Sequence, residues 1–331
     1  MRSLPKVTFA VEDFSLGSPA QQLLDRFLIG YNRDGQFYSP GSDVELVASK
    51  QDNAAVEARM KNFRLKTSSN LEEAQSVVMT GAAREYLAKL PNGARCFVYG
   101  TLADTSSDTR DLLSIAADRK IGLRAGTAVA GAFQLPAVQA PNQVSRALAV
   151  TYGPFPQAEI EAVEALWSFS GPGKIGPKLK LLTAEAVWQS AYSKEWAQLF
   201  AAAFSRSNTI QGDPVKDGRT QDVAGLRLVE KLVKEPRAWL IEEGNGSRIA
   251  VFVLNGALED LNISFQGPDQ NVISTQLYRP PPPTQDHFSG LVGQIEDFFR
   301  QDAHPSLPRG LEALSGILEL MRIAGKGQFR G

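Results

Sequence analysis

The chain has 331 residues, of which 43% are hydrophobic and 21% are charged, and its formal net charge is −1. This length allows two domains with separate cores, and the balanced charge gives no basis for a nucleic-acid-binding or membrane-binding surface. A single cysteine, Cys96, and two histidines, His287 and His304, exclude an internal disulfide and a thiolate or multi-histidine metal centre.

The first third of the chain alternates strand-like with helix-like segments. The predicted strands are 6–11, 43–49, 76–81, 94–100 and 121–126. The predicted helices are 18–31, 53–63, 82–90 and 107–120, with a further short helix around 70–74. Short apolar runs rich in β-branched residues are typical of parallel strands covered on both faces. Repeated βα units therefore predict a doubly wound Rossmann-type parallel sheet within residues 1–125.

Residues 126–305 have a different pattern, which predicts an α+β domain. A strand at 144–152 leads to a helix at 158–169, a loop at 170–178 and a helical region at 183–204. Four strand candidates follow in series, at 237–243, 247–255, 260–267 and 271–279. Turn signals at 243–246 and 267–269 join two pairs of them as hairpins. We therefore predict an antiparallel meander that forms an open sheet.

After the meander, Pro280 to Pro283 predict an extended connector, because four prolines cannot continue a central strand. Two helices close the chain. The first reads "HFSGLVGQIEDFF", and the second, "GLEALSGILELMRIAGKG", follows the loop "DAHPSLPRG". This ending, with the element order before it, resembles the glucose–fructose oxidoreductase/inositol dehydrogenase/MocA (Gfo/Idh/MocA) family over nearly the whole chain. The resemblance implies a sugar or cyclitol ligand and an NAD or NADP cofactor. It further implies that the segment 306–331 packs back near the first domain.

The family's cofactor loop corresponds to the turn from Glu12 to Pro19. Members of the family have several glycines there, which let the backbone approach a pyrophosphate, whereas this turn has only Gly17. By resemblance, the cofactor-binding candidates are Asp13, Gly17, Ser18, Ser49, Lys50, Tyr99 and Thr101. Two acidic residues in the first turn would repel a phosphate. We therefore predict that NAD or NADP binds weakly or not at all.

The residues that carry the family's chemistry are also changed. The lysine of the family's Glu-Lys-Pro motif is absent from the turn 99–104, and Gln157 and Glu161 replace the catalytic Asp and His. Glu161, as a base, and Tyr152 are the catalytic candidates implied by this alignment. The alternative is that Glu161 belongs, with Glu159 and Glu164, to the polar face of an ordinary helix. His287, at the start of a helix, and His304, in a turn, are more typical of structural positions.

Two functions follow from these observations. The first is an oxidoreductase of the family with atypical cofactor handling. The second is a catalytically silent binding protein or a non-catalytic subunit. In either, a sugar ring would lie against Tyr99 and Tyr152, at the C-terminal ends of the first-domain strands.

Assembly and location can also be predicted. Alternation of apolar and polar residues along the last four strands, as at Ile263 and Phe265, predicts a face that a second copy would cover, and hence a homodimer. No apolar run reaches the roughly 20 residues of a membrane span, and no signal-peptide pattern appears. We therefore expect a cytoplasmic protein with no membrane contact.

Overall fold

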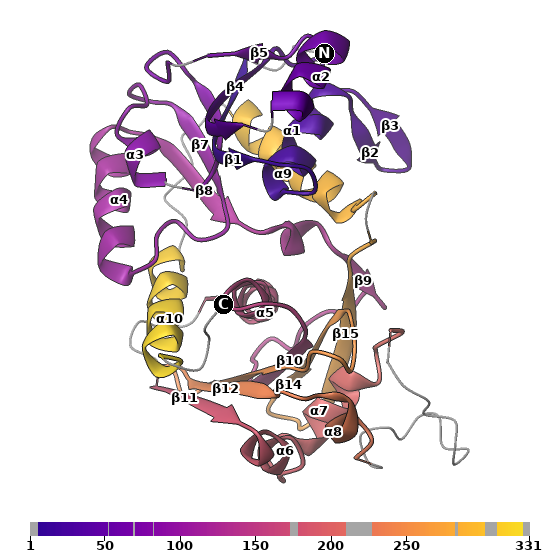
Figure 1. Ribbon diagram of the computed structural model, residues 1–331. Helices are drawn as coiled ribbons and strands as arrows, with labels where there is room; N and C mark the ends of the chain where they lie inside the picture. The colour runs from indigo at the N-terminus through magenta and orange to yellow at the C-terminus, as the bar shows by residue number, and fades with distance from the viewer. Residues whose placement is uncertain are drawn as a thin grey trace. The chain divides into compact units, whose positions relative to one another are not determined.

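A computed structural model describes residues 6–51, 53–68, 70–81, 83–172, 178–209, 227–281, 284–301 and 310–326. The chain forms two compact units (Figure 1): Met1–Ala132 with Arg279–Ser315, and Phe133–Tyr278 with Gly316–Gly331. These boundaries differ from the predicted 1–125, 126–305 and 306–331. The chain returns to the first unit at Arg279, so the helix after the proline run belongs there and not to the domain that contains the meander.

The first unit is built on a parallel sheet with the order β5-β4-β1-β6-β7-β8. The strands are β1 Val7–Phe14, β4 Val44–Gln51, β5 Lys66–Thr67, β6 Ser76–Thr80, β7 Arg95–Tyr99 and β8 Gly122–Gly126. The predicted Rossmann-type sheet is therefore confirmed. Its central strand, β1, runs three residues beyond the predicted end, and its register with β4 continues to the pair of Phe14 with Gln51. This extension shortens the turn that follows.

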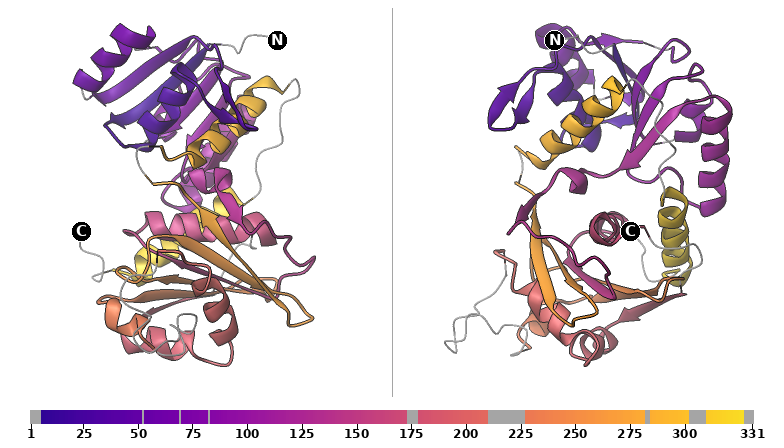
Figure 2. Two further views of the ribbon diagram at one scale, coloured as in Figure 1. Left: turned by 90° about the vertical axis from the view of Figure 1, so that its right-hand side faces the viewer. Right: turned by 180° about the vertical axis from the view of Figure 1, so that it is seen from behind.

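The helices of this unit are α1 Pro19–Leu28, α2 Asn53–Phe63, α3 Ala83–Leu87, α4 Ser106–Asp118, α9 His287–Arg300 and the first turns of α10 Leu311–Ala324, with a 3₁₀ turn, η1 Ala128–Gly131. Both views of Figure 2 show α9 beside the N-terminal elements. Phe27 of α1 and Phe298 of α9 belong to one buried cluster with Phe9 of β1. The final part of the chain thus completes a core begun by the first strand.

One local prediction for this unit is wrong, and one pair of strands was not predicted. The segment 70–74 is a turn and not a helix, and the Asn70 side chain accepts the N–H of Glu72 at 2.8 Å, as in an Asx turn. A hairpin that we did not predict, β2 Tyr31–Arg33 and β3 Gln36–Tyr38, follows α1. Asp34 and Gly35 form its turn with φ of 52° and 76°, as a two-residue type I′ hairpin requires.

The second unit holds a seven-stranded sheet with the order β11-β12-β13-β10-β14-β15-β9. The strands are β9 Phe133–Leu135, β10 Arg146–Thr151, β11 Lys178–Thr183, β12 Arg237–Glu242, β13 Arg248–Val253, β14 Leu261–Gln266 and β15 Val272–Tyr278. The predicted hairpins β12–β13 and β14–β15 are confirmed. The continuous meander is wrong, because β10 lies between β13 and β14, parallel to the first and antiparallel to the second.

Helices cover both faces of this sheet (Figure 1). The helix α5 Gln157–Ser170 packs on one face, and α6 Glu185–Ala191, α7 Ala197–Phe204 and α8 Val229–Leu232 pack on the other. Phe265 contacts Phe169 of α5, with ring centroids 4.9 Å apart, while Ser264 donates to the Leu199 carbonyl of α7 at 2.8 Å. The alternation that suggested an exposed face therefore separates two buried faces. The expectation of an open sheet face that a second copy would cover is therefore wrong. Homodimerisation stays a prediction, but this face no longer supports it.

Within the described ranges, no helix combines the length and the apolar character that crossing a membrane would need.

Candidate functional site

The turn that corresponds to the family's cofactor loop comprises only residues 15–18, between β1 and α1. Ser18 is the N-cap of α1, and its hydroxyl accepts the N–H of Gln21 at 3.2 Å. The Gln21 side-chain oxygen in turn accepts the N–H of Gly17 at 2.5 Å. Pro19 has no N–H to offer. At this helix end, the N–H groups of Gly17, Ser18 and Gln21 are therefore used by the chain itself, and the N–H of residue 19 is missing.

A Ser-x-x-Gln pattern could have revealed this arrangement from the sequence. Ser or Thr followed three residues later by Glu or Gln is the signature of a capping box, in which the two side chains take the free N–H groups of a helix start. Here Ser18 and Gln21 have that spacing. The glutamine reaches Gly17, one residue before the cap, where φ is +81°.

The acidic pair of the predicted turn has a different position from the one expected. Glu12 and Asp13 lie inside β1 rather than in the turn, because β1 continues to Phe14. Asp13 is in register with Lys50 of β4. The side chains of Asp13, Ser49 and Lys50 lie outside the described part of the structure, as does all of His304, so their predicted roles stay predictions.

The turn after β7 contains the next two candidates. Tyr99 ends the strand, and its ring stacks on Phe288 of α9 with centroids 6.0 Å apart and an angle of 20° between the planes. One face of the ring is therefore covered by the protein. Thr101 is half-buried, two residues farther on. Tyr99 is thus better placed to pack α9 onto the sheet than to offer two open faces.

The helix α5 presents the predicted base. Gln157 and Glu161 share one side of the helix, four residues apart, and the Gln157 amide donates to Glu161 Oε1 at 2.6 Å. Both side chains are partly exposed. Tyr152 instead packs against the cluster beneath α6 to α8, on the opposite face of the sheet from α5. The structure therefore pairs Gln157 with Glu161, but it places the Tyr152 ring on the other side of the sheet.

Glu159, which the sequence suggested as part of a polar helix face, is fully buried. Its Oε1 accepts hydrogen bonds from Arg237 Nε at 2.7 Å and Trp239 Nε1 at 3.2 Å. Arg237 also donates to the Gly153 carbonyl at 2.9 Å, in the turn that precedes α5. Glu159 is therefore a structural anchor, which leaves Glu161 as the accessible carboxylate of this helix end.

A second anchor holds the other end of α5. Trp167 donates from Nε1 to Glu243 Oε1 at 2.8 Å, just after β12. On the helix, Glu159 and Trp167 are eight residues apart, about 12 Å. Their partners Trp239 and Glu243 are four residues apart, about 13 Å along an extended chain. Because these lengths match, each end of the helix has one glutamate–tryptophan hydrogen bond: the glutamate is on the helix at one end and on the sheet side at the other. As a result, the backbone that carries Gln157 and Glu161 is fixed against the sheet.

The remaining candidates for chemistry, a cysteine and a histidine, are buried. Cys96 is fully buried in β7, and burial raises the pKa of its thiol, as expected for a structural cysteine. Burial, with Arg279 and Arg26 nearby, lowers the pKa of His287 to about 4. No group of three potential metal ligands occurs among the described residues.

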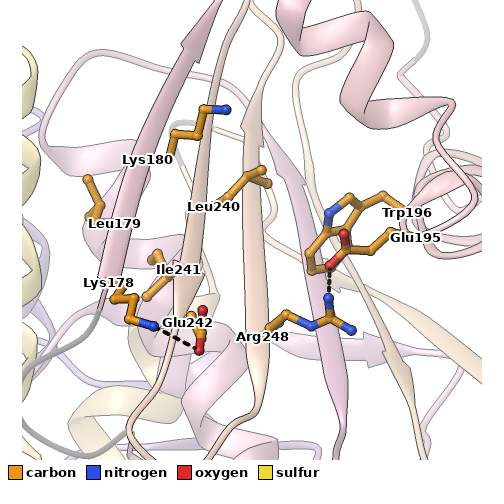
Figure 3. Close-up of a pocket in the computed structure, with 9 residues that line it drawn as sticks. All are labelled: Lys178, Leu179, Lys180, Glu195, Trp196, Leu240, Ile241, Glu242 and Arg248. Atoms are coloured by element: carbon orange, nitrogen blue, oxygen red, sulfur yellow. Dashed lines mark hydrogen bonds and ion pairs between the residues drawn. The ribbon is translucent and has the colours of Figure 1, made fainter.

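A hollow of about 270 Å³ lies on the second unit's sheet, where Figure 3 shows Leu240 between Lys180 and the Trp196 ring. Two ion pairs border it: Lys178 with Glu242 at 3.4 Å, and Arg248 with Glu195 at 2.6 Å. Two of its three cations are thus already neutralised. We assign it no catalytic role.

No family model and no curated protein matches the chain by sequence. Solved structures match it over nearly its whole length. Myo-inositol 2-dehydrogenase from Lactobacillus plantarum has a TM-score of 0.62 at 8% identity and covers 97% of both chains. Myo-inositol dehydrogenase from Lactobacillus casei, in complex with NAD(H) and myo-inositol, has a TM-score of 0.59 at 12% identity and covers 98% of this chain and 95% of its own.

Scyllo-inositol dehydrogenase from Lactobacillus casei matches with a TM-score of 0.58 at 9% identity, over 99% of this chain and 97% of its own. The resemblance to the Gfo/Idh/MocA family is therefore confirmed at the level of the fold. All three of these neighbours are inositol dehydrogenases.

Proposed function

We propose that this chain is a binding protein of the Gfo/Idh/MocA fold that takes a sugar- or cyclitol-class small molecule and does not use a nicotinamide cofactor. The ligand class is supported by the fold, since a structural neighbour binds myo-inositol. The loss of the cofactor is supported by one observation above all. The start of α1 is closed by Ser18 and Gln21, whose side chains take the N–H groups that a pyrophosphate would need.

A dinucleotide therefore does not fit the described residues of this turn without displacing the Gln21 side chain. A phosphate oxygen would replace the Gln21 side-chain oxygen as the acceptor of the Gly17 N–H, so binding would form one hydrogen bond and break another, with little net gain in free energy. We expect NADH and NADPH to bind more weakly than about 100 μM, near −5.5 kcal/mol. Isothermal titration of each nucleotide measures this, and a dissociation constant in the low micromolar range would refute the proposal.

The ligand itself is to be found with a panel of cyclitols and monosaccharides. All four tryptophans lie between residues 167 and 239, so a ligand near α5 should change the intrinsic fluorescence. Glu161→Gln should weaken binding several-fold, because a carboxylate accepts hydroxyl hydrogen bonds more strongly than an amide does. The matched control is Glu185→Gln, which changes an exposed glutamate at the start of α6 and should leave binding unchanged.

The second candidate function is an oxidoreductase in which Glu161 acts as the base. It is favoured by the Gln157–Glu161 hydrogen bond, which orients the carboxylate on an accessible helix face. In that case the wild-type chain would oxidise one member of the panel with NAD or NADP, and Glu161→Gln would abolish turnover. For a binding protein, neither form turns over and only affinity changes.

A further inference from the structure

A second hollow lies entirely within the first unit and contains no residue of α5. It has a volume of about 530 Å³ and is formed by α1, the β2–β3 hairpin and the residues just before and at the start of α9. We call it the hairpin groove. The lining residues used below are Asp25, Ile29, Asn32, Phe37, Asp286 and Ser289. Its volume is within the range of small-molecule sites, about 300–1,000 Å³.

The walls of the hairpin groove are fixed before any ligand arrives. The five N–H groups of Arg26 make five hydrogen bonds: two to Gln22, one to the Ser289 hydroxyl, and one each to the carbonyls of Thr284 and Gln285. This arginine therefore binds α1 to the start of α9. The Tyr31 hydroxyl donates to the buried Glu296 carboxylate at 2.5 Å, which holds the hairpin on α9.

The charges around the groove cancel. Asp25 is held by Arg59 through two hydrogen bonds of 2.5 Å. Arg26 is close enough to Asp286 for their charges to interact, and the Asp286 carboxylate also accepts the Ser289 hydroxyl at 2.6 Å. A charged ligand would therefore meet no excess of opposite charge. A neutral ligand with hydroxyl groups meets carboxylate oxygens that retain acceptor sites, together with the exposed amide of Asn32.

The rim of the groove is apolar and exposed. Phe37 is 67% exposed and Ile29 is 42% exposed, although both line the same hollow. The tip of the Phe37 ring lies against Gly30, where a Cβ atom would come within 2.7 Å of a ring carbon. The ring thus rests with its tip on the Gly30 backbone while most of its surface faces solvent. A single exposed apolar residue needs no explanation, but two that border a polar hollow resemble a binding platform.

We propose that the hairpin groove binds a neutral, hydroxyl-rich ring such as a pyranose or a cyclitol. The ring's C–H face packs on Phe37, whose π surface attracts the partly positive hydrogens. The hydroxyl groups bond to Asn32, Asp286 and their neighbours. This inference stands on the groove alone and does not depend on the function proposed for α5.

Saturation-transfer NMR with methyl β-glucopyranoside and myo-inositol, each at millimolar concentration with the full chain, tests the proposal. We expect a signal from Glu161→Gln, in which the site proposed on α5 is weakened, that falls at least fivefold when Phe37→Ala or Asn32→Ala is added. Phe63→Ala is the matched control, because Phe63 is also an exposed aromatic residue of this unit, lies on α2, and does not line the groove. It should keep the full signal.

The experiment separates this site from the one proposed on α5. A signal that survives in Glu161→Gln without any change in tryptophan fluorescence supports the hairpin groove. A signal lost in Glu161→Gln but kept in Phe37→Ala overturns the proposal. The absence of any signal at about 10 mM, roughly the weakest binding expected of a built site, overturns it as well. Circular dichroism of Phe37→Ala checks that the fold is intact, and Asn32→Ala provides a second reading if it is not.

Discussion

The buried Glu159–Arg237 pair allows a sharp test of how α5 is held. Arg237→Met removes the charge but keeps most of the side-chain volume, so Glu159, which is fully buried, keeps a carboxylate without its cation. Removing one partner of a buried ion pair costs about 3–5 kcal/mol of unfolding free energy. At about 2–4 °C per kcal/mol for a unit of this size, the melting temperature should fall by roughly 6–20 °C.

The chain supplies a matched control. Arg248 forms an ion pair with Glu195 at 2.6 Å, almost the same distance as the 2.7 Å of the buried pair, but its side chain is 48% exposed. Arg248→Met should therefore cost less than about 1 kcal/mol. Differential scanning calorimetry and urea titration measure both variants. The double variant Glu159→Gln with Arg237→Met, which leaves no buried charge at this pair, should recover most of the loss.

Two outcomes would refute this reasoning. If Arg237→Met and Arg248→Met cost the same, burial does not decide the energy of these pairs. If the double variant is no more stable than Arg237→Met, the loss comes from the Gly153 carbonyl, which also accepts a hydrogen bond from Arg237, rather than from an uncompensated charge.

Three further predictions concern the rest of the chain. Burial, Arg279 and Arg26 lower the pKa of His287 to about 4, so between pH 7 and pH 5 the histidine is protonated in the unfolded chain but stays neutral in the folded one. The free energy of unfolding should therefore fall by about 2 kcal/mol over this range, and His287→Gln should remove this pH dependence in urea titrations. Gly35→Ala should cost about 1 kcal/mol and loosen the hairpin in hydrogen exchange, since φ is 76° there; unchanged exchange would contradict the turn assignment. Asp260→Ala should speed amide exchange at residues 208 and 259, because the Asp260 carboxylate accepts five hydrogen bonds, one from the N–H of Asn208 and one from the Thr209 hydroxyl, which in turn accepts the N–H of Glu259; equal exchange would show that packing alone orders this corner.

The parts of the fold that could be predicted from the sequence are those set by local patterns. Apolar β-branched runs marked every strand of the parallel sheet from β1 to β8 except the two-residue β5. The hairpins β12–β13 and β14–β15 followed from their turn residues. The place of β10 between β13 and β14 could not be predicted in the same way, because strand pairing over about 100 residues leaves no local signal.

The candidate site shows the same limit. The four-residue spacing that puts Gln157 beside Glu161 follows from helix geometry, and the structure has it. Nothing in the local pattern distinguishes Glu159, which is fully buried, from its partly exposed neighbour Glu161. The difference depends on Arg237 and Trp239, which are about 80 residues away. The hairpin with its turn at Asp34 and Gly35, by contrast, could have been predicted from its Asp-Gly pair, although we did not predict it.

The place of α9 in the first unit has a consequence for synthesis on the ribosome. The core that begins with Phe9 is completed by Phe298, and the whole sheet of the second unit is encoded between them. From the end of β8 at residue 126 to the end of α9 at residue 300, the ribosome needs roughly 10–35 seconds at about 5–20 residues per second. During that time the first six-stranded sheet lacks the helix that covers part of its apolar surface. All strands of the second sheet lie within one continuous segment of the chain, so this sheet can form before α9 is made. A chain released before α9 is made would therefore expose apolar surface of the first unit rather than of the second.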